Sequence, residues 1–264
     1  MENYNNNNVD DLGYGYDGFS ETTNNVFETA KASSDFYGLN FGPVSYGQAV
    51  DTAAVIRKSF GFMVIALLIT AFAAFTTSPI TVIKLVQSDA YWLVIIGEIA
   101  IVLISNAALK RNNVVLAGIL YTVYSYLTGM LCSIIFLLYT GTSITSVFLI
   151  TAAMFGAMCV FGFVTKKDLS GFGSICMMGL IGIIIASLVN LFLLRSEGLD
   201  FIISLIGVAI FVGLTAYDMQ KIKEMAGASD ESRENALALF GAFQLYLDFI
   251  NLFLKLLRLL GKKK

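Results

Sequence analysis

The chain has 264 residues, of which 57% are hydrophobic and only 14% are charged, and its formal net charge is −2. A soluble domain carries about 25% charged residues, so this composition excludes an ordinary soluble protein and favours one that crosses a membrane several times. The sequence contains no His, which excludes His-based catalytic triads, His metal ligands and His pH switches.

The first 50 residues form a polar, acidic segment that contains the runs NYNNNN, DDLGYGYDG and SETTNN. Seven acidic residues lie in it against one basic residue, Lys31, so the rest of the chain is basic. Such a segment cannot bury a hydrophobic core, and we expect a disordered tail at 1–50 followed by a membrane domain at 51–264. The segment also lacks the pattern of a cleavable signal peptide, so insertion is expected to use the first span.

Apolar runs of membrane length follow, since about 20 residues of helix cross about 30 Å of hydrocarbon. Residues 112–165 carry no charge and are long enough for two spans, separated at the TGTS sequence of 140–143. The last run is apolar in the same way but contains charged residues. We therefore predict an all-α polytopic membrane protein, a seven-helix bundle with spans at about 59–77, 90–109, 114–138, 144–164, 173–194, 199–217 and 236–260.

The distribution of Lys and Arg between the short loops predicts the orientation, because these residues favour the cytoplasmic side. A cytoplasmic N-terminus leaves only Lys84 and Arg195 in the outer loops. The seventh span would then place the final GKKK outside, against the same rule, so a re-entrant seventh helix stays open as an alternative. The cations on the inner segments are Arg57, Lys58, Lys110, Arg111, Lys166, Lys167, Lys221, Lys223 and Arg233.

Ionisable residues interrupt the apolar runs. Glu98 lies within the second span, Asp218 follows the sixth, and Asp248 lies in the body of the seventh. Lys255 and Arg258 add two cations near the end of the seventh span. An ionised side chain at the bilayer centre costs about 2.5–3.5 kcal/mol on insertion scales, so such residues usually face the bundle interior and pair with one another.

Depth along the spans predicts which of these residues pair. With the N-terminus inside, Glu98 and Arg258 both fall in the outer half of the membrane, which predicts an intramembrane ion pair. Asp218 and Asp248 fall nearer the inner side on neighbouring spans, so their carboxyl groups are expected to approach each other. For Lys255 and Arg258, snorkelling to the membrane surface is the alternative.

The two aspartates are the predicted pH sensor. Two carboxyl groups in one low-dielectric site cannot both ionise cheaply, so they share a proton over some range of pH. The three cysteines lie in apolar runs without CxxC spacing, which favours small buried hydrophobic residues over a zinc or redox site. No P-loop occurs, and we expect no enzymatic activity and no cofactor.

Four sequence motifs resemble the Bax inhibitor family, the transmembrane Bax inhibitor motif proteins. Two contain the aspartates, GLTAYDMQKIKEM at 213–225 and FQLYLDFINLFLKLLRLLG at 243–261. The others are LYTVYSYLTGM at 120–130 and VTKKDLSGFGSICMMGLIGIIIASLVNLF at 164–192. The resemblance covers about residues 45–261, and the motifs with the aspartates are its specific part.

The resemblance implies a seven-helix bundle with the C-terminal helix in the centre, and a pH-sensitive leak of calcium with a role in stress or cell-death control. It implies that Asp218 and Asp248 form the pH sensor and gate and are the candidate calcium ligands, and that Glu98 contacts Arg258. An Arg at the inner end of the second span also belongs to the family pattern, and its candidates here are Lys110 and Arg111. Lys255 is a third candidate supporting cation.

Other functions fit parts of the pattern. An aspartyl intramembrane protease needs GxGD at its second Asp, where this chain has LYLD, and a retinal protein needs a Lys in the last helix, where Lys255 lies near the end. A proton-coupled secondary transporter remains the main alternative, although no inverted repeat is visible. A non-conducting regulator of a membrane protease or death factor is the third.

The expected partners are the lipid bilayer, calcium, protons and other membrane proteins, with no nucleic acid. We expect a multi-pass protein of the plasma (inner) membrane if the source is a bacterium, or of an endomembrane if it is a eukaryote, with the N-terminus in the cytoplasm.

Overall fold

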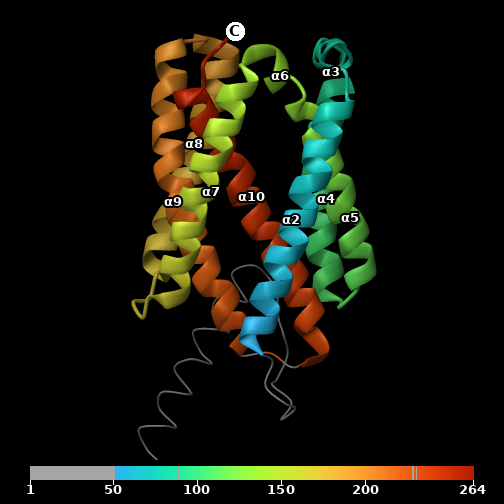
Figure 1. The fold of residues 1–264 in the computed structure, drawn as a ribbon, viewed down its shortest axis with the longest axis vertical. Coiled ribbons are helices and arrows are strands. Elements are labelled where there is room, and N and C mark those ends of the chain that lie inside the picture. The colour runs from blue at the N-terminus through green and yellow to red at the C-terminus, as the bar shows by residue number, and fades with distance from the viewer. Residues whose placement is uncertain (1–50, 89, 228, 230) are drawn as a thin grey trace, which may run out of the picture.

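The computed structural model in Figure 1 describes residues 51–264 except 89, 228 and 230, so the predicted tail at 1–50 lies outside the described residues. Seven helices, with their short extensions, are long and apolar enough to cross a membrane, and the described residues form no β-sheet. The predicted all-α seven-helix class is therefore confirmed. The helices are α2 (Thr52–Thr76), α4 (Ala90–Lys110), α5 (Val114–Cys132), α7 (Gly141–Val164), α8 (Ser170–Val189), α9 (Glu197–Gly227) and α10 (Glu234–Leu260).

Short helical segments join the long ones. A helix α3 (Pro79–Val86) follows α2, and α6 (Ile135–Leu138) extends α5. A π-helix, η1 (Asn190–Leu194), extends α8, and a 3₁₀ turn, η2 (Glu231–Arg233), precedes α10. Figure 1 shows α3, α6 and the C-terminus at one end of the bundle, opposite the end where α2 and α10 begin.

Local sequence signals explain several helix ends. Asp51 caps α2 by accepting a hydrogen bond from the Ala53 amide, and Asn113 caps α5 by accepting one from the Leu116 amide. Pro79 is the first residue of α3, where its missing N–H costs nothing, and it also separates α3 from α2. Asn112 has a positive φ of 55°, which Asn tolerates better than most residues, and this lets the chain turn sharply from α4 into α5.

Helix α10 is the most buried of the seven. In its most apolar stretch 72% of the residues are buried, against 44% or less for the other six helices. It packs against α9, α2, α7, α5 and α4, and Figure 1 shows it crossing between the other helices. The outer helices instead expose many Ile, Leu, Val and Phe side chains, which suits contact with lipid.

The sixth helix is longer than the apolar pattern predicts. We expected this span to end at Tyr217 and a linker to occupy 219–235, but α9 continues to Gly227. Charged residues such as Lys221 and Glu224 end the apolar run, yet they are good helix formers, and no Gly or Pro occurs between Tyr217 and Gly227. The apolar pattern therefore marked the end of the membrane-like segment rather than the end of the helix.

Helix α10 is one continuous helix of 27 residues, so the re-entrant alternative is wrong. At 1.5 Å per residue it is about 40 Å long, enough to cross the hydrocarbon. The chain after it is held at the end of the bundle that contains α6. There the Thr140 amide donates to the Lys262 carbonyl, and the Lys264 amide donates to the Leu138 carbonyl.

Small residues allow two close helix contacts. A Cβ at Gly129 in α5 would overlap the Thr70 carbonyl of α2, and a Cβ at Gly162 in α7 would overlap the Ala216 carbonyl of α9. Close approach through glycine is a common way for membrane helices to pack. Lipid tails are as apolar as the helix surfaces, so helix association in a membrane depends on close van der Waals contact rather than on the hydrophobic effect.

Two glycines of α7 provide a matched test of this packing. Gly162→Ala should destabilise the protein by about 1–3 kcal/mol, since the new methyl group must displace the α9 backbone. Gly156→Ala should leave stability unchanged or slightly raised, because a Cβ there meets no atom within 4 Å. Thermal unfolding of the detergent-solubilised variants, followed by circular dichroism, measures both. Equal melting temperatures for the two variants would contradict the close contact.

Candidate functional site

The structure brings the side chains of Asp218 and Asp248 together in the bundle interior. Asp218 lies on α9 and Asp248 on α10, and these two helices pack along each other. The two residues are only 5% and 4% exposed, and their carboxyl groups are hydrogen-bonded to one another. A hydrogen bond between two carboxyl groups needs a proton on one of them, so this arrangement holds at least one neutral carboxyl group.

One oxygen of the pair has no partner. Oδ2 of Asp248 is buried and makes no hydrogen bond among the described residues. Buried polar atoms are almost always satisfied, so this carboxyl oxygen is an exception among the buried groups of the bundle. Such an oxygen is also the type of ligand that calcium prefers.

The pair alone cannot form a complete calcium cage. Calcium takes about six to eight oxygen ligands, and the part of the chain that the structure describes contains no group of three or more Asp, Glu, Cys or His side chains able to hold a metal. Two carboxyl groups therefore suit a brief contact with a passing cation better than a tightly held ion.

Lys221 is the cation that the sequence analysis failed to assign to this site. It follows Asp218 by three residues on α9, is only 2% exposed, and is close enough to interact electrostatically with Asp218. Its ammonium group donates to the Tyr217 hydroxyl at 3.4 Å and lies 5.5 Å from the centre of that ring. The spacing of three residues on one helix was the signal for this neighbour, but Lys221 was counted only as an inner-loop charge.

The supporting roles of Lys110 and Arg111 stay a prediction. Both residues are exposed at the junction of α4 and α5, and none of the interactions given for the described residues joins them to either aspartate.

A largely apolar cavity lies at the end of the bundle at which α2 begins, and neither aspartate is among its lining residues. It has a volume of about 430 Å³ and lies between α2, α7 and α9, with Arg57, Phe60, Cys159 and Met219 among its lining residues. Cys159 also interacts electrostatically with both aspartates, so one side chain borders the cavity and the pair. All three cysteines are free thiols; Cys159 and Cys176 are buried and Cys132 is half-buried.

The predicted ion pair between Glu98 and Arg258 is not formed. Glu98, half-buried on α4, accepts a hydrogen bond of 3.2 Å from the Thr128 hydroxyl of α5. Arg258 instead binds Asp200 on α9 through two contacts, of 3.2 Å and 3.3 Å. The prediction was based on the equal depth of Glu98 and Arg258 in the membrane. Depth does not determine which neighbouring helix a side chain faces. The start of α9 lies beside the last turn of α10, so Arg258 meets Asp200 there.

Asp200 connects three helical segments at this end of the bundle. Besides Arg258, it accepts a hydrogen bond of 3.0 Å from the amide of Asn190, which in turn accepts one from the Ser196 backbone. The network joins the π-helix η1, the first turn of α9 and the end of α10. Lys255 lies nearby with its aliphatic chain against Gly207, as the snorkelling alternative expects for a partly buried lysine.

Comparisons with known proteins give a consistent result. A family model described as inhibitor of apoptosis-promoting Bax1 matches residues 52–264. The chain is 45% identical over 215 residues to the inner membrane protein YbhL of Escherichia coli, covering 79% of this chain and 92% of that protein. It is 46% identical over 211 residues to an uncharacterized protein, RP147, of Rickettsia prowazekii, covering 78% and 89% of the two chains.

The ion pair at the end of α10 can be tested by a double-mutant cycle. Arg258→Gln and Asp200→Asn should show a coupling energy of about 0.2–1 kcal/mol, the range for partly exposed pairs. Arg258→Gln and Glu98→Gln should be additive, because the two side chains have different partners. Thermal unfolding of the single and double variants measures both cycles. Coupling of Arg258 to Glu98 rather than to Asp200 would instead support the Glu98–Arg258 ion pair predicted from the sequence.

Proposed function

Because this chain belongs to the Bax inhibitor family and is an integral, multi-pass membrane protein, we propose that it is a calcium leak whose rate is set by pH through Asp218 and Asp248. The observation that supports this proposal is the buried, hydrogen-bonded carboxyl pair between α9 and α10, with one oxygen unpaired. The family's description as an inhibitor of apoptosis-promoting Bax1 supports a further role in ion homeostasis and in stress or cell-death control.

The proton between the two carboxyl groups is the proposed control element. With the proton in place, a hydrogen bond joins α9 to α10. Without it, two like charges about 4 Å apart repel by about 4 kcal/mol at an effective dielectric constant of 20. This energy is enough to change the ratio of two conformations of the protein from about 5:95 to about 95:5. The repulsion can be relieved by a shift of the helices or by a bound cation, and both responses change the path for calcium.

Lys221 and the adjacent cavity determine how ions approach the pair in this proposal. The buried ammonium group of Lys221 offsets part of the negative charge, so the pair can lose its proton without an unpaired double charge. The cavity lined by Cys159 and Met219 lies on the side of the bundle at which α2 begins, and in this proposal ions approach the aspartates from that end. The unpaired Asp248 oxygen would be a contact point for a dehydrating calcium ion.

We also propose that the N-terminus faces the cytoplasm and that the protein resides in an inner membrane. Arg57, Lys110 and Lys166, with the other inner-segment cations, lie at the end of the bundle where α2 begins, whereas Lys84 and Arg195 lie at the other end. The positive-inside rule places the first end in the cytoplasm. A relative that is 45% identical is described as an inner membrane protein, which supports the same location.

Calcium flux through the purified protein in liposomes tests the function directly. The rate should change by about tenfold or more between about pH 5.5 and 8, because 1.4 kcal/mol of the repulsion already gives a tenfold change. The double variant Asp218→Asn with Asp248→Asn should abolish this pH response, since neither side chain can ionise. An internal calcium-sensitive dye measures the rate at each pH.

Asp168 provides the matched control for that experiment. It lies exposed in the loop between α7 and α8, and hydrogen bonds from the Ser170 side chain and backbone hold the pKa of its carboxyl group below its usual value. It is therefore ionised throughout the tested range, and Asp168→Asn should keep the pH response. A response that survives loss of both buried aspartates would remove them as the sensor.

The same assay separates the alternative functions. Calcium movement that requires a proton gradient would indicate a proton-coupled transporter, and absence of flux at every pH would favour a regulator that acts by contact with another membrane protein.

Thiol labelling tests the orientation. In a variant whose three native cysteines are replaced by Ala, single cysteines are introduced by Lys166→Cys and Lys263→Cys, both at exposed positions. An impermeant maleimide added to intact spheroplasts should label position 263 and should label position 166 only after permeabilisation. The opposite pattern would reverse the proposed orientation, and labelling of both positions in intact spheroplasts would place both on one side.

A further inference from the structure

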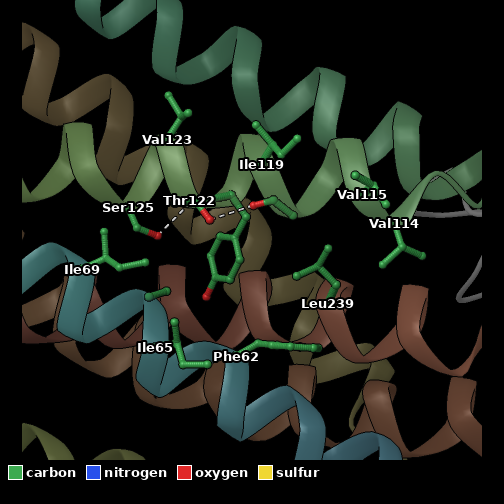
Figure 2. Close-up of a pocket in the computed structure, with 13 residues that line it drawn as sticks. Phe62, Ile65, Ile69, Val114, Val115, Ile119, Thr122, Val123, Ser125 and Leu239 are labelled. Atoms are coloured by element: carbon green, nitrogen blue, oxygen red, sulfur yellow. Dashed lines mark hydrogen bonds between the residues drawn. The ribbon is translucent and has the colours of Figure 1, made fainter.

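A groove on the outer surface of the bundle lies between α2 and α5. Figure 2 shows Phe62, Ile65 and Ile69 of α2 on one side and Ile119 and Val123 of α5 on the other, with Leu239 of α10 between them. Its volume is about 570 Å³, within the range of about 300–1,000 Å³ that is usual for ligand sites.

The groove offers little to a polar ligand. The Thr122 hydroxyl donates to the Gly118 carbonyl and the Ser125 hydroxyl to the Tyr121 carbonyl, as the dashed lines in Figure 2 show. The Tyr121 hydroxyl donates to the Ala242 carbonyl of α10. Because these hydroxyl protons are already used within the protein, the groove favours a hydrocarbon chain over a molecule that needs hydrogen-bond donors.

The length of the groove matches one leaflet of a bilayer. Val114, the first residue of α5, lines one end, and Ser125 lies eleven residues further along the same helix. At 1.5 Å per residue the α5 wall is about 16 Å long, and half of the hydrocarbon core is about 15 Å thick. A lipid chain entering at Val114 would therefore fill the groove and end near the bilayer centre.

Two cations stand at the end where such a chain would enter. Lys110 is the last residue of α4, and Arg111 precedes Val114 by three residues. Both side chains are exposed, and neither forms an ion pair within residues 51–264, apart from the gaps at 89, 228 and 230. Asn113, which caps α5, and Asn112, whose amide donates to the Ser232 carbonyl, hold the turn that carries them.

On the α2 side of the entrance, Lys58 is already paired. Lys58 lies one turn before Phe62, but it pairs with Glu234 at 2.9 Å and donates to the Asn235 side chain at 2.9 Å. Lys110 and Arg111 are therefore the exposed cations on the α4–α5 turn at the entrance.

We propose that this groove binds an anionic phospholipid, with one acyl chain between α2 and α5 and the phosphate on Arg111 and Lys110. The charge at the entrance selects an anionic headgroup, and the apolar walls of leaflet length select a lipid over a free phosphate. The lipid belongs to the leaflet at which α2 begins. This binding is independent of ion conduction, so it holds whether or not the protein is a calcium leak.

Native mass spectrometry of the delipidated full-length protein tests the proposal. The protein is titrated with palmitoyl-oleoyl phosphatidylglycerol and with phosphatidylcholine that has the same acyl chains. Phosphatidylglycerol should bind more tightly. Lys110→Gln with Arg111→Gln should weaken phosphatidylglycerol binding by about fivefold for each cation and bring it close to phosphatidylcholine.

Filling the groove should weaken binding of both lipids. Gly118→Leu places a side chain in it, and a Cβ at this position meets only Leu239, at an ordinary 3.8 Å, so the helix packing is kept. If Gly118→Leu lowers the melting temperature, Ile119→Trp fills the groove from a position that is 57% exposed.

Two control variants make the outcome decisive. Gly182→Leu adds the same side chain to the lipid-facing side of α8, where a Cβ meets no atom within 4 Å, and Lys166→Gln with Lys167→Gln removes two exposed charges from the same end of the bundle. Both should bind the two lipids as the unmodified protein does. The proposal is overturned if the charge control loses as much phosphatidylglycerol binding as the Lys110 and Arg111 variant, if folded groove-filling variants bind normally, or if the two lipids bind equally.

Discussion

Burial of the Asp218–Asp248 carboxyl pair in protein rather than in lipid is the constraint on which the rest of the bundle depends. A charged side chain at the bilayer centre costs about 2.5–3.5 kcal/mol, and an unpaired carboxyl oxygen in hydrocarbon is also unfavourable. The chain meets this constraint by packing five other helices against α10. These outer helices expose apolar side chains to lipid, so α10 can carry Asp248, Gln244 and Asn251 in the middle of a membrane protein.

The seven helices and the two aspartates could be predicted because their signals are local. An apolar run of membrane length indicates a span without any knowledge of its neighbours, and a carboxyl group inside such a run is visible as an exception. The length of α9 could not be predicted in the same way, because hydropathy reports where lipid contact ends. The segment from Asp218 to Gly227 loses its apolar character but keeps helix-forming residues, and it packs inside the bundle as helix.

The pairing of charges required information that one sequence does not contain. Position along a span gives the depth of a side chain, but the partner is determined by which face of the helix it occupies and which helix lies beside that face. Glu98 and Arg258 have compatible depths, yet one faces Thr128 of α5 and the other Asp200 of α9. Lys221 was predictable in principle from its spacing to Asp218, because residues three apart on a helix are neighbours.

Helix α10 is held at both ends, which limits how it can respond to charge in its middle. The Lys58–Glu234 pair holds its first turn, while the Arg258–Asp200 pair and the bonds of the last residues to 138–140 hold the other end. Partly exposed ion pairs contribute about 0–1 kcal/mol each, whereas two close carboxylates repel by about 4 kcal/mol at an effective dielectric constant of 20. In the proposed mechanism the repulsion therefore exceeds either ion pair alone. Because the two anchors lie at opposite ends and the aspartates between them, the proposed repulsion acts on the part of α10 between its anchors, where it packs against α9.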